Sequence, residues 1–322
     1  KTMQQTVTSI PCNLCASTDT EEISLVDRDN QYLRSVICLK CGLSWTDPRQ
    51  NEEEIQKYYS KDYRIAYKGT YIPRLKHVYR AGRIADHRYG FIKDLIKPND
   101  KVLDVGAGGG EFVFRLRKAG FDAEGIEPNE GYGTYAKETL ELPIRIGFVQ
   151  QFELPDDHCD FITLHHVFEH LDDPAKILVK LRKALKMRGF LVIDVPNIEG
   201  TCFAPIHRFH KAHLYNFNQE NLELMGIKGG FSVYKTVISD DGGVITTIFQ
   251  KDETEGGLSG EIPGNYERVA KIVRGHSTAT HYLTSSPYVR PIQKLQKSLS
   301  ERRAVWDCKT GREVLERMFG GK

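Results

Sequence analysis

The sequence predicts an α/β protein built on a doubly wound, mainly parallel sheet, with a small cysteine-rich module before it and helices after it. Three observations carry this prediction. Apolar strand-like runs alternate with helix-like segments over roughly residues 96–250, a glycine-rich turn follows the first of these runs, and two Cys-x-x-Cys pairs precede them. In such sheets, ligands bind at the carboxyl ends of the strands.

Length and charge bound the class of protein. The chain has 322 residues and a formal charge of +2, which suits one catalytic domain with attachments and disfavours a protein dedicated to coating nucleic acid. It contains no apolar run of about 18 residues and no charged-then-apolar leader, so we expect a cytoplasmic protein. We divide it into a zinc ribbon (1–47), a helical linker or lid (48–97), a cofactor-binding domain (98–252), and a linker with a basic helical extension (253–322).

The first element is the cysteine module. Cys12 and Cys15 form one Cys-x-x-Cys pair and Cys38 and Cys41 the other, and together they complete a tetrahedral zinc site. Strands at 23–26 and 33–37 bring the two pairs together. Because four thiolates leave no open coordination position, we expect a structural zinc ion, with redox chemistry as the alternative. Residues 1–50 hold five Lys or Arg and six Asp or Glu, so phosphate binding is disfavoured and a lid or substrate-side wall is favoured.

Two helices are predicted between this module and the first strand of the sheet. The first spans 52–59 and leads into a tyrosine cluster, in which Tyr59 and Tyr63 are candidates to close over a cofactor or, more simply, to anchor the linker by packing. The second spans 74–96 and ends before the turn Pro98-Asn99-Asp100.

The glycine-rich turn carries most of the functional information. Residues 102–112 read VLDVGAGGGEF, a buried strand followed by clustered glycines that let backbone approach a ligand. A dinucleotide fingerprint fails, because Glu111 stands where its third glycine belongs. Asp104 and Glu111 would repel a pyrophosphate and attract the sulfonium and ammonium groups of S-adenosylmethionine. The next strand, 122–127, ends in Glu127, where a carboxylate can accept hydrogen bonds from both ribose hydroxyls.

These residues resemble the first motif of the class I S-adenosylmethionine-dependent methyltransferases, Asp/Glu-x-Gly-x-Gly-x-Gly. The resemblance implies a cofactor-binding turn formed by Asp104, Gly106, Ala107 and Gly108. The segment CGLSWTDPR and the tyrosine cluster after it also resemble the front end of zinc-ribbon-bearing methyltransferases that act on sugars and other small molecules.

The remaining elements follow in order. We expect helices at 112–119, 131–140, 175–185 and 219–225, and strands at 144–148, 161–165, 190–195, 231–239 and 244–250. The last two strands are joined by Asp240-Asp241-Gly242-Gly243, a connection short enough for an antiparallel hairpin. The class I methyltransferase sheet ends in such a hairpin.

The resemblance also implies further cofactor contacts. Phe148 and Val149 fall where the family recognises adenine, although many relatives carry an acidic residue at the position of Phe148, so we favour apolar stacking and the Val149 backbone. His165 and His166 follow the fourth strand, beside the methionine end of the cofactor. The segment EHLDDP at 169–174 resembles that of the ubiquinone-biosynthesis-type branch.

An alcohol acceptor gains from a base, and histidine is best suited to that role near neutral pH. We rank His213 first as general base, with His170 and Glu169 as further catalytic candidates. Simpler interpretations stay open: His170 with Asp172 can cap the next helix, and the histidines at 207, 210 and 213 can ligate a metal, although their spacing winds around a helix.

The C-terminal segment is basic: residues 265–322 hold twelve Lys or Arg and five Asp or Glu. Ile292, Leu295, Leu299 and Trp306 recur at helical spacing, which predicts an amphipathic helix. It can bind a membrane surface or a phosphorylated carrier, or pack on the catalytic domain or a dimer mate.

We therefore expect a zinc-ribbon S-adenosylmethionine-dependent methyltransferase that acts on a hydroxyl of a small polar acceptor. The resemblance favours a sugar-like substrate from a nucleotide-sugar or surface-polysaccharide pathway. The alternatives are a sugar C-methyltransferase, an RNA methyltransferase, which the acidic ribbon disfavours, and a cofactor-binding protein without turnover.

Overall fold

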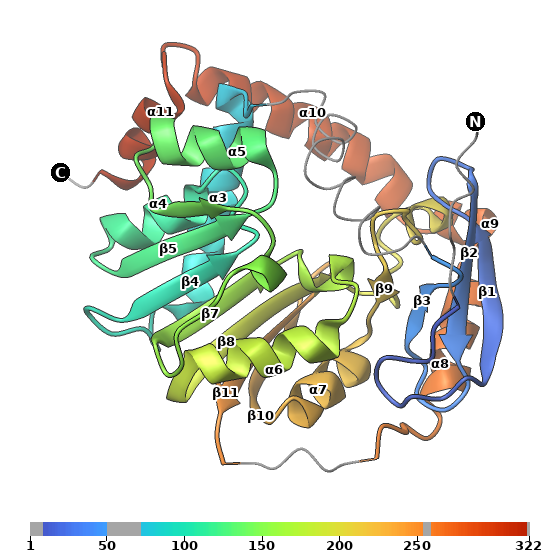
Figure 1. Cartoon of the computed structure of the whole chain (residues 1–322). Helices are drawn as coiled ribbons and strands as arrows, with labels where there is room; N and C mark the ends of the chain where they lie inside the picture. The colour runs from blue at the N-terminus through green and yellow to red at the C-terminus, as the bar shows by residue number, and fades with distance from the viewer. Residues whose placement is uncertain (1–8, 50–71, 254–258, 321–322) are drawn as a thin grey trace, which may run out of the picture. The chain divides into compact units, whose positions relative to one another are not determined.

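The computed structural model describes residues 9–49, 72–253 and 259–320. They form two compact units: 9–49 with 164–290, and 72–163 with 291–320. The helix predicted at 52–59 and the tyrosine cluster lie outside the described residues. A seven-stranded sheet has the order β10-β11-β8-β7-β4-β5-β6, and a four-stranded sheet has the order β1-β2-β3-β9 (Figure 1).

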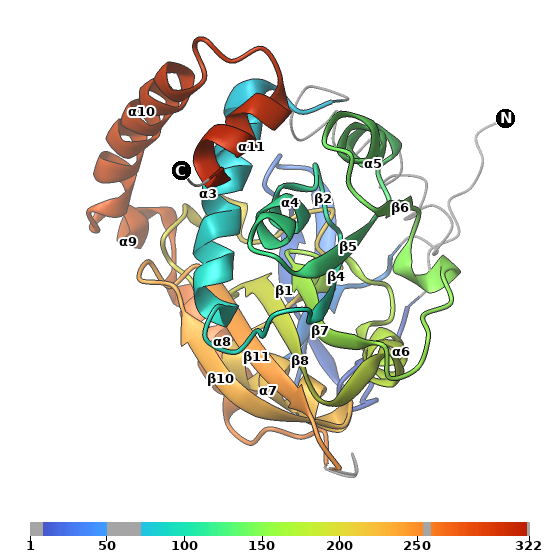
Figure 2. The same ribbon diagram turned by 90° about the vertical axis from the view of Figure 1, so that its left-hand side faces the viewer.

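The unit of residues 72–163 and 291–320 contains the first half of the predicted α/β alternation. Its elements are α3 (Leu75–Ile92), β4 (Lys101–Val105), α4 (Glu111–Lys118), β5 (Asp122–Glu127), α5 (Glu130–Thr134), η2 (Tyr135–Thr139), β6 (Ile144–Ile146), η3 (Val149–Gln151), most of β7 (Cys159–His165), most of α10 (Ser286–Ala304) and α11 (Gly311–Phe319). Strands β4, β5 and β6 pair in parallel, as predicted. Helix α11, which the sequence analysis did not separate from α10, packs on α3 and α4 (Figure 2).

The other unit contains the cysteine module and the second half of the alternation. Its elements are β1 (Thr20–Val26), β2 (Tyr32–Cys38), β3 (Ser44–Thr46), η4 (Phe168–His170), α6 (Pro174–Ala184), β8 (Leu185–Pro196), η5 (Pro205–His207), β9 (Tyr215–Asn216), α7 (Gln219–Lys228), β10 (Phe231–Ile238), β11 (Val244–Lys251), α8 (Asn265–Gly275) and α9 (Thr278–Tyr282). Strand β11 pairs antiparallel with both β8 and β10, which confirms the predicted final hairpin.

Strand β9 was not predicted, and it changes the account of the ribbon. Ser44 pairs with Asn216 and Trp45 with Tyr215, so the fourth strand of the cysteine module comes from the segment after β8. Trp45 and Tyr215 are almost completely buried. The sheet of the cysteine module is therefore built from two segments of the chain, with β1, β2 and β3 from the N-terminal segment and β9 from the segment after β8.

Helix α8 covers the same module. Ile37 of β2, Ile198, Phe209 and Val269 of α8 form one buried apolar cluster. The residues after 253 are thus more than a linker and basic extension, because their first helix completes the core of the ribbon.

Two predicted helices differ in detail. The predicted helix at 131–140 is wrong as a continuous α-helix, because it becomes a π-helix over Tyr135–Thr139. The helix predicted at 74–96 ends at Ile92.

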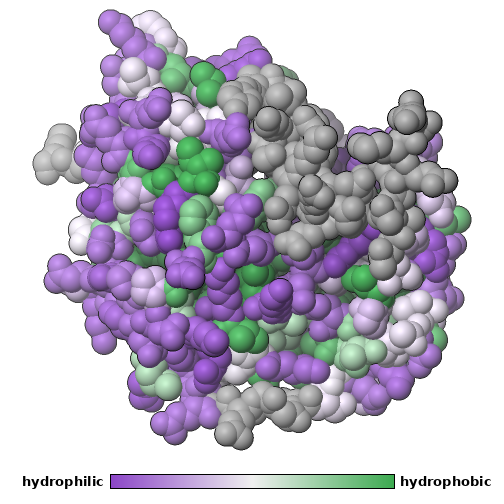
Figure 3. All heavy atoms as spheres, in the orientation of Figure 1, coloured by the Kyte–Doolittle hydropathy of each residue, from purple (hydrophilic) through white to green (hydrophobic). Residues whose placement is uncertain are grey.

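The helix predicted near the C-terminus is present as α10, but it ends at Ala304, before Trp306. Its apolar side chains are largely exposed, with Ile292 at 60% and Leu295 at 62%. On the face seen in Figure 3, hydrophobic residues among those that the structure describes form only small, separated groups. What covers α10 stays a prediction.

Candidate functional site

The glycine-rich turn follows β4 in the way that the sequence predicted. Gly106, Gly108 and Gly110 have φ angles of 79°, 58° and 83°, a left-handed conformation that favours glycine. Gly110 is the residue that caps α4. Asp104 lies in β4 itself, one residue before the strand ends, and is buried.

The amides of this turn are used within the protein. Those of Gly106 and Ala107 donate to the carbonyl of Ile126, at 2.7 and 2.9 Å, and that of Gly110 donates to Ala107. A phosphate-binding loop instead points its amides at the ligand. The turn is therefore poorly suited to a pyrophosphate, as the charge argument predicted.

Glu127 ties the turn to the end of β5. Its carboxylate accepts hydrogen bonds from the amide of Gly108 at 2.7 Å and from the amide of Asn129 at 3.0 Å, and the residue is 3% exposed. Asp104 accepts a hydrogen bond from the hydroxyl of Thr163 at 2.7 Å. Two buried carboxylates thus flank the turn, which suits a cationic ligand.

The predicted adenine contacts lie at the start of η3. The amide of Phe148 donates to the side chain of Gln151 at 3.0 Å, and Val149 is buried. Their contact with an adenine ring stays a prediction.

The two histidines after β7 have different surroundings. His165 is buried, and its Nδ1 lies 2.6 Å from a carboxylate oxygen of Asp194 in β8, a partner that the sequence analysis missed. His166 has a φ of 57°, and its side chain is 42% exposed. Its Nδ1 lies 3.4 Å from Oε1 of Glu169. Contact of either histidine with the methionine end of a cofactor stays a prediction.

The structure brings the three predicted catalytic residues together. Glu169, His170 and His213 each offer one ligand-type atom, and these atoms all lie within 4.8 Å of one another. Nε2 of His170 lies 3.8 Å from Oε1 of Glu169, and the rings of His170 and His213 lie 5.0 Å apart. Residues from η4 and from the segment before β9 therefore meet in one polar cluster, which we call the Glu-His-His cluster.

Backbone contacts hold this cluster in place. Nδ1 of His170 donates to the carbonyl of Ala212 at 2.6 Å, because a carbonyl can only accept. The amide of Leu214 donates to the carbonyl of Glu169 at 2.9 Å. The first bond places a hydrogen on Nδ1 of His170, so in the neutral ring Nε2 carries the lone pair.

Burial sets the charge of the cluster. It lowers the pKa of His213 well below its usual range, and the neighbouring His170 lowers it further, so His213 is neutral. Burial raises the pKa of Glu169, but His170 and His166 outweigh that effect and lower it to about 2, so Glu169 is ionised. The cluster therefore pairs a carboxylate with a neutral imidazole.

The other two histidines of the segment are not part of the group of ligand-type atoms, although the ring of His210 lies 5.1 Å from that of His213. Nδ1 of His210 accepts the amide of Ala212 at 3.1 Å, and burial lowers the pKa of His210 to about 4. His207 lies in η5 and is exposed. The alternative in which 207, 210 and 213 share one metal is therefore not supported. Nor does His170 cap the next helix, because the side chain of Asp173 accepts the amide of Lys176 and is the cap of α6.

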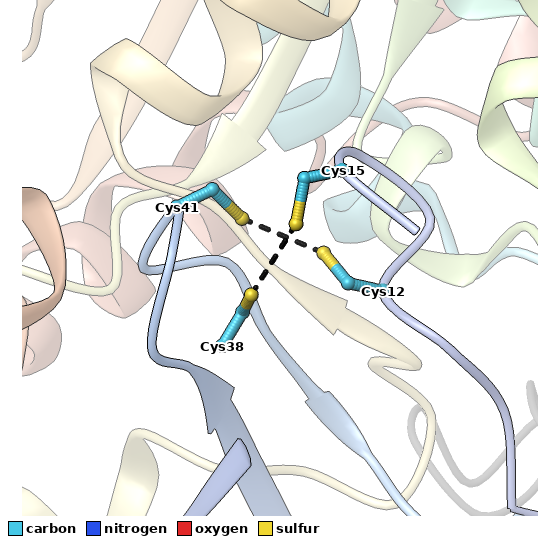
Figure 4. Close-up of side chains that lie close together, drawn as sticks. All are labelled: Cys12, Cys15, Cys38 and Cys41. Atoms are coloured by element: carbon cyan, nitrogen blue, oxygen red, sulfur yellow. Dashed lines mark hydrogen bonds between the residues drawn. The ribbon is translucent and has the colours of Figure 1, made fainter. Parts of the chain in front are cut away.

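The four cysteines of the ribbon form a second cluster (Figure 4). Their sulfurs point toward one another, with Cys12 Sγ 3.4 Å from Cys41 Sγ and Cys15 Sγ 3.4 Å from Cys38 Sγ. No cysteine in the described part of the chain forms a disulfide. The four thiols are placed to hold one metal ion.

Two later helices support this cysteine cluster. Side-chain amides of Asn221 in α7 and Asn265 in α8 both donate to the carbonyl of Cys41, at 2.7 and 2.8 Å. The amine of Lys228 donates to the carbonyl of Leu14 at 2.7 Å. Both cysteine knuckles are thus anchored by residues outside the module.

The glycine turn, the buried acidic residue at the end of β5 and the terminal antiparallel hairpin define a Rossmann-like methyltransferase. A family model described as a methyltransferase domain matches residues 77–235. The chain belongs to the class I S-adenosylmethionine-dependent methyltransferases, whose methyl donor is S-adenosylmethionine.

Curated relatives agree with this family. The chain is 27% identical over 141 residues to an uncharacterized methyltransferase of Schizosaccharomyces pombe, covering 39% of this chain and 51% of that protein. It is 30% identical over 117 residues to a ubiquinone biosynthesis O-methyltransferase of Hydrogenovibrio crunogenus, and the match covers 34% of this chain and 48% of that protein. It is 25% identical over 198 residues to phosphoethanolamine N-methyltransferase 3 of Arabidopsis thaliana, and the match covers 54% of this chain and 40% of that protein. The chain spans about half the length of the curated relatives that it matches.

A solved structure gives a further comparison. The S-adenosylmethionine dependent methyltransferase of Mesorhizobium loti covers 51% of this chain and 97% of its own, with 12% identity and a TM-score of 0.45. Among the described residues, no helix is both long and apolar enough to cross a membrane.

Proposed function

We propose that this methyltransferase transfers a methyl group to a hydroxyl of a small polar acceptor. The observation that carries the proposal is the Glu-His-His cluster, in which a half-buried neutral imidazole and a buried carboxylate lie side by side. Such a pair can accept the proton of a hydroxyl group, which must leave when an alcohol is methylated.

The reaction itself makes modest demands on the protein. Methyl transfer from a sulfonium is an in-line displacement, so the protein must align donor and acceptor and exclude water. Asp104 and Glu127 are proposed to hold the cationic donor, with Glu127 accepting from the ribose hydroxyls. Neutral His213 has a lone pair to offer, either to the hydroxyl proton, as the sequence analysis expected, or to a metal ion.

For the acceptor we propose a sugar, as part of a nucleotide sugar or a surface-polysaccharide precursor. The support is the resemblance of the ribbon and its following segment to zinc-ribbon methyltransferases that act on sugars. The hydroxyl of Thr46 in β3 also lies 3.4 Å from the carbonyl of His213, so the ribbon contacts the segment that carries the Glu-His-His cluster. This contact supports a role of the ribbon as a wall on the acceptor side.

We further propose that the ribbon holds a structural zinc ion. Four sulfurs bound to zinc at about 2.3 Å lie about 3.8 Å apart, close to the 3.4 Å of the two sulfur pairs. Cys12, Cys15, Cys38 and Cys41 would hold it and leave no position for substrate. A reducing compartment such as the cytoplasm would keep these thiols free for the metal.

A turnover screen tests the acceptor class. The full chain is incubated with S-adenosylmethionine labelled in its methyl group and with nucleotide sugars, glycans, deoxysugars and RNA. We expect label on a sugar oxygen, and loss of turnover in His213→Ala but not in His207→Ala. Label on a sugar carbon or on RNA would instead support the alternatives, and full activity of His213→Ala would exclude the role given to the cluster.

A further inference from the structure

Glu169 has a feature that a role in proton transfer does not explain. It is 1% exposed, and neither carboxylate oxygen accepts a hydrogen bond from any residue that the structure describes. The distance of 3.4 Å to Nδ1 of His166 is longer than the 2.7–2.9 Å typical of a charge-assisted hydrogen bond. The two histidine contacts of Glu169, at 3.4 and 3.8 Å, are too long to replace the hydrogen bonds that a buried carboxylate loses, so a cation bound directly to it would be favourable.

The atoms that would face this cation are of the right kind. Oε1 of Glu169 and Nε2 of His170 lie 3.8 Å apart, and a ring nitrogen of His213 lies within 4.8 Å of both. Ligands bound to one ion at about 2.1 Å lie about 3–3.4 Å apart, so a small inward movement closes the site. Two imidazoles and one carboxylate form a ligand set that divalent transition metals bind with positions left open.

The surroundings of His170 match those of a metal ligand. A ligating histidine usually donates its other ring N–H to a carbonyl or carboxylate, which fixes the ring and its tautomer. His170 does so, through Nδ1 to the carbonyl of Ala212 at 2.6 Å. This bond aims the Nε2 lone pair toward Glu169.

We propose that Glu169, His170 and His213 bind a divalent transition-metal ion whose open position takes the hydroxyl oxygen of the methyl acceptor. The metal-binding part stands on these contacts alone, and the role of the ion rests on the function proposed above. In this arrangement His213 is a metal ligand and not the general base.

The chemistry balances without an oxidant. The ion lowers the pKa of the bound hydroxyl, whose O–H bond breaks as its proton passes to solvent. The alkoxide oxygen forms a bond to the methyl carbon, and the bond from that carbon to sulfur breaks. The products are a methyl ether, neutral S-adenosylhomocysteine and one proton, and the ion keeps its charge.

Manganese is a suitable probe, because imidazole and carboxylate ligands accept it whereas the four thiolates of the ribbon favour zinc. The full chain, purified with zinc in the ribbon, is titrated with Mn²⁺, and free Mn²⁺ is followed by electron paramagnetic resonance. We expect one bound Mn²⁺ per chain. Loss of a ligand-orienting contact alone costs about 10–100-fold in affinity, so Glu169→Gln should weaken binding by more than about 100-fold.

The matched control is His207→Ala, which removes an exposed histidine of the same segment and should bind Mn²⁺ like the wild type. Should Glu169→Gln fail to fold, judged by circular dichroism, His213→Gln replaces it. A second readout is the visible absorption of Co²⁺ added to the zinc-loaded chain. A band from nitrogen and oxygen ligands is expected, and it should disappear in the variant.

The outcomes separate the two proposals. If wild-type chain takes up no Mn²⁺ or Co²⁺ beyond the zinc of the ribbon, or if the variants bind as well as wild type, the metal site is excluded, whatever the enzyme methylates. If Mn²⁺ binds through Glu169 and His213 but no hydroxyl acceptor is methylated, the site stands and the proposed function fails. Methylation at full rate after removal of the bound ion would exclude a role for the metal in the reaction.

Discussion

Glu127→Gln tests how the donor is bound. The substitution keeps the shape of the side chain but replaces one carboxylate oxygen with an NH₂ group and removes the charge. In the wild type both oxygens are in use, since they accept from the amides of Gly108 and Asn129. The new NH₂ group must therefore face one of these N–H donors.

The magnitude follows from the bonds at stake. A hydrogen bond to a charged group contributes about 1.5–3 kcal/mol and a neutral one about 1 kcal/mol. The variant loses one ribose bond and weakens the other, a total of about 3 kcal/mol, which is about a 100-fold rise in Kd for S-adenosylmethionine. Leaving one buried amide unpaired should also lower the free energy of unfolding by about 1–3 kcal/mol.

Isothermal titration calorimetry with S-adenosylmethionine measures the Kd. The control is Glu124→Gln in the same strand, where the carboxylate is 41% exposed and accepts from Arg145 at 3.0 Å. We expect its Kd to match that of the wild type. A Glu127→Gln variant that folds and binds within about threefold of wild type would refute the assignment of Glu127 to the ribose.

Three further predictions concern stability. Gly226→Ala in α7 should destabilise the protein by about 1–3 kcal/mol in chemical denaturation, because a Cβ there would overlap the ring of Phe249 in β11. The control is Gly90→Ala in α3, where a Cβ would have nothing within 4 Å. This variant should be neutral or stabilising by up to about 1 kcal/mol. Glu301→Gln should cost about 1–2 kcal/mol at neutral pH, since Glu301 is buried against the guanidinium of Arg80 at 2.7 and 2.5 Å. Cys38→Ser should remove one zinc per chain by elemental analysis and unfold the ribbon.

The effect of Glu301→Gln on stability should depend on pH. Burial raises the pKa of Glu301, but Arg80 outweighs it and lowers the pKa below its usual range. A lowered pKa in the folded state contributes stability above the unfolded value of about 4.3, and that contribution is lost as the pH falls through the folded pKa. The difference between wild type and Glu301→Gln should therefore shrink on acidification below about pH 4.3, and a constant difference down to acidic pH would contradict the pairing.

Local patterns in the sequence were enough to predict the sheet and the glycine-rich turn after β4. The clustered glycines, Asp104 and Glu127 are close in sequence and repeat a known spacing, and the structure has β5 at the residues predicted, Asp122–Glu127. The two cysteine pairs were equally easy to identify, because each pair is local in the sequence. Only the contact between the two pairs depends on the tertiary structure.

The contacts that the sequence analysis missed join residues that are far apart in the sequence and lie in segments without a recognisable pattern of their own. Strand β9 has only two residues and no strand pattern of its own, so its pairing with β3 depends entirely on tertiary packing. Asp194 is one polar residue within the apolar run 190–195 of β8, and its partner His165 lies 29 residues away. His213 was identified by its type and position, but its meeting with Glu169 was visible only in three dimensions.

The pairing of β3 with β9 has a consequence for biosynthesis. Thr46 and His213 touch although 167 residues separate them. At about 5–20 residues per second, a nascent chain makes its cysteine knuckles roughly 10–30 seconds before their last strand exists. Through that interval the edge of β3 and the indole of Trp45 lack the partner that buries them in the finished protein. Ribosome-bound intermediates of this chain should therefore attract chaperones until the second half of the enzyme has been translated.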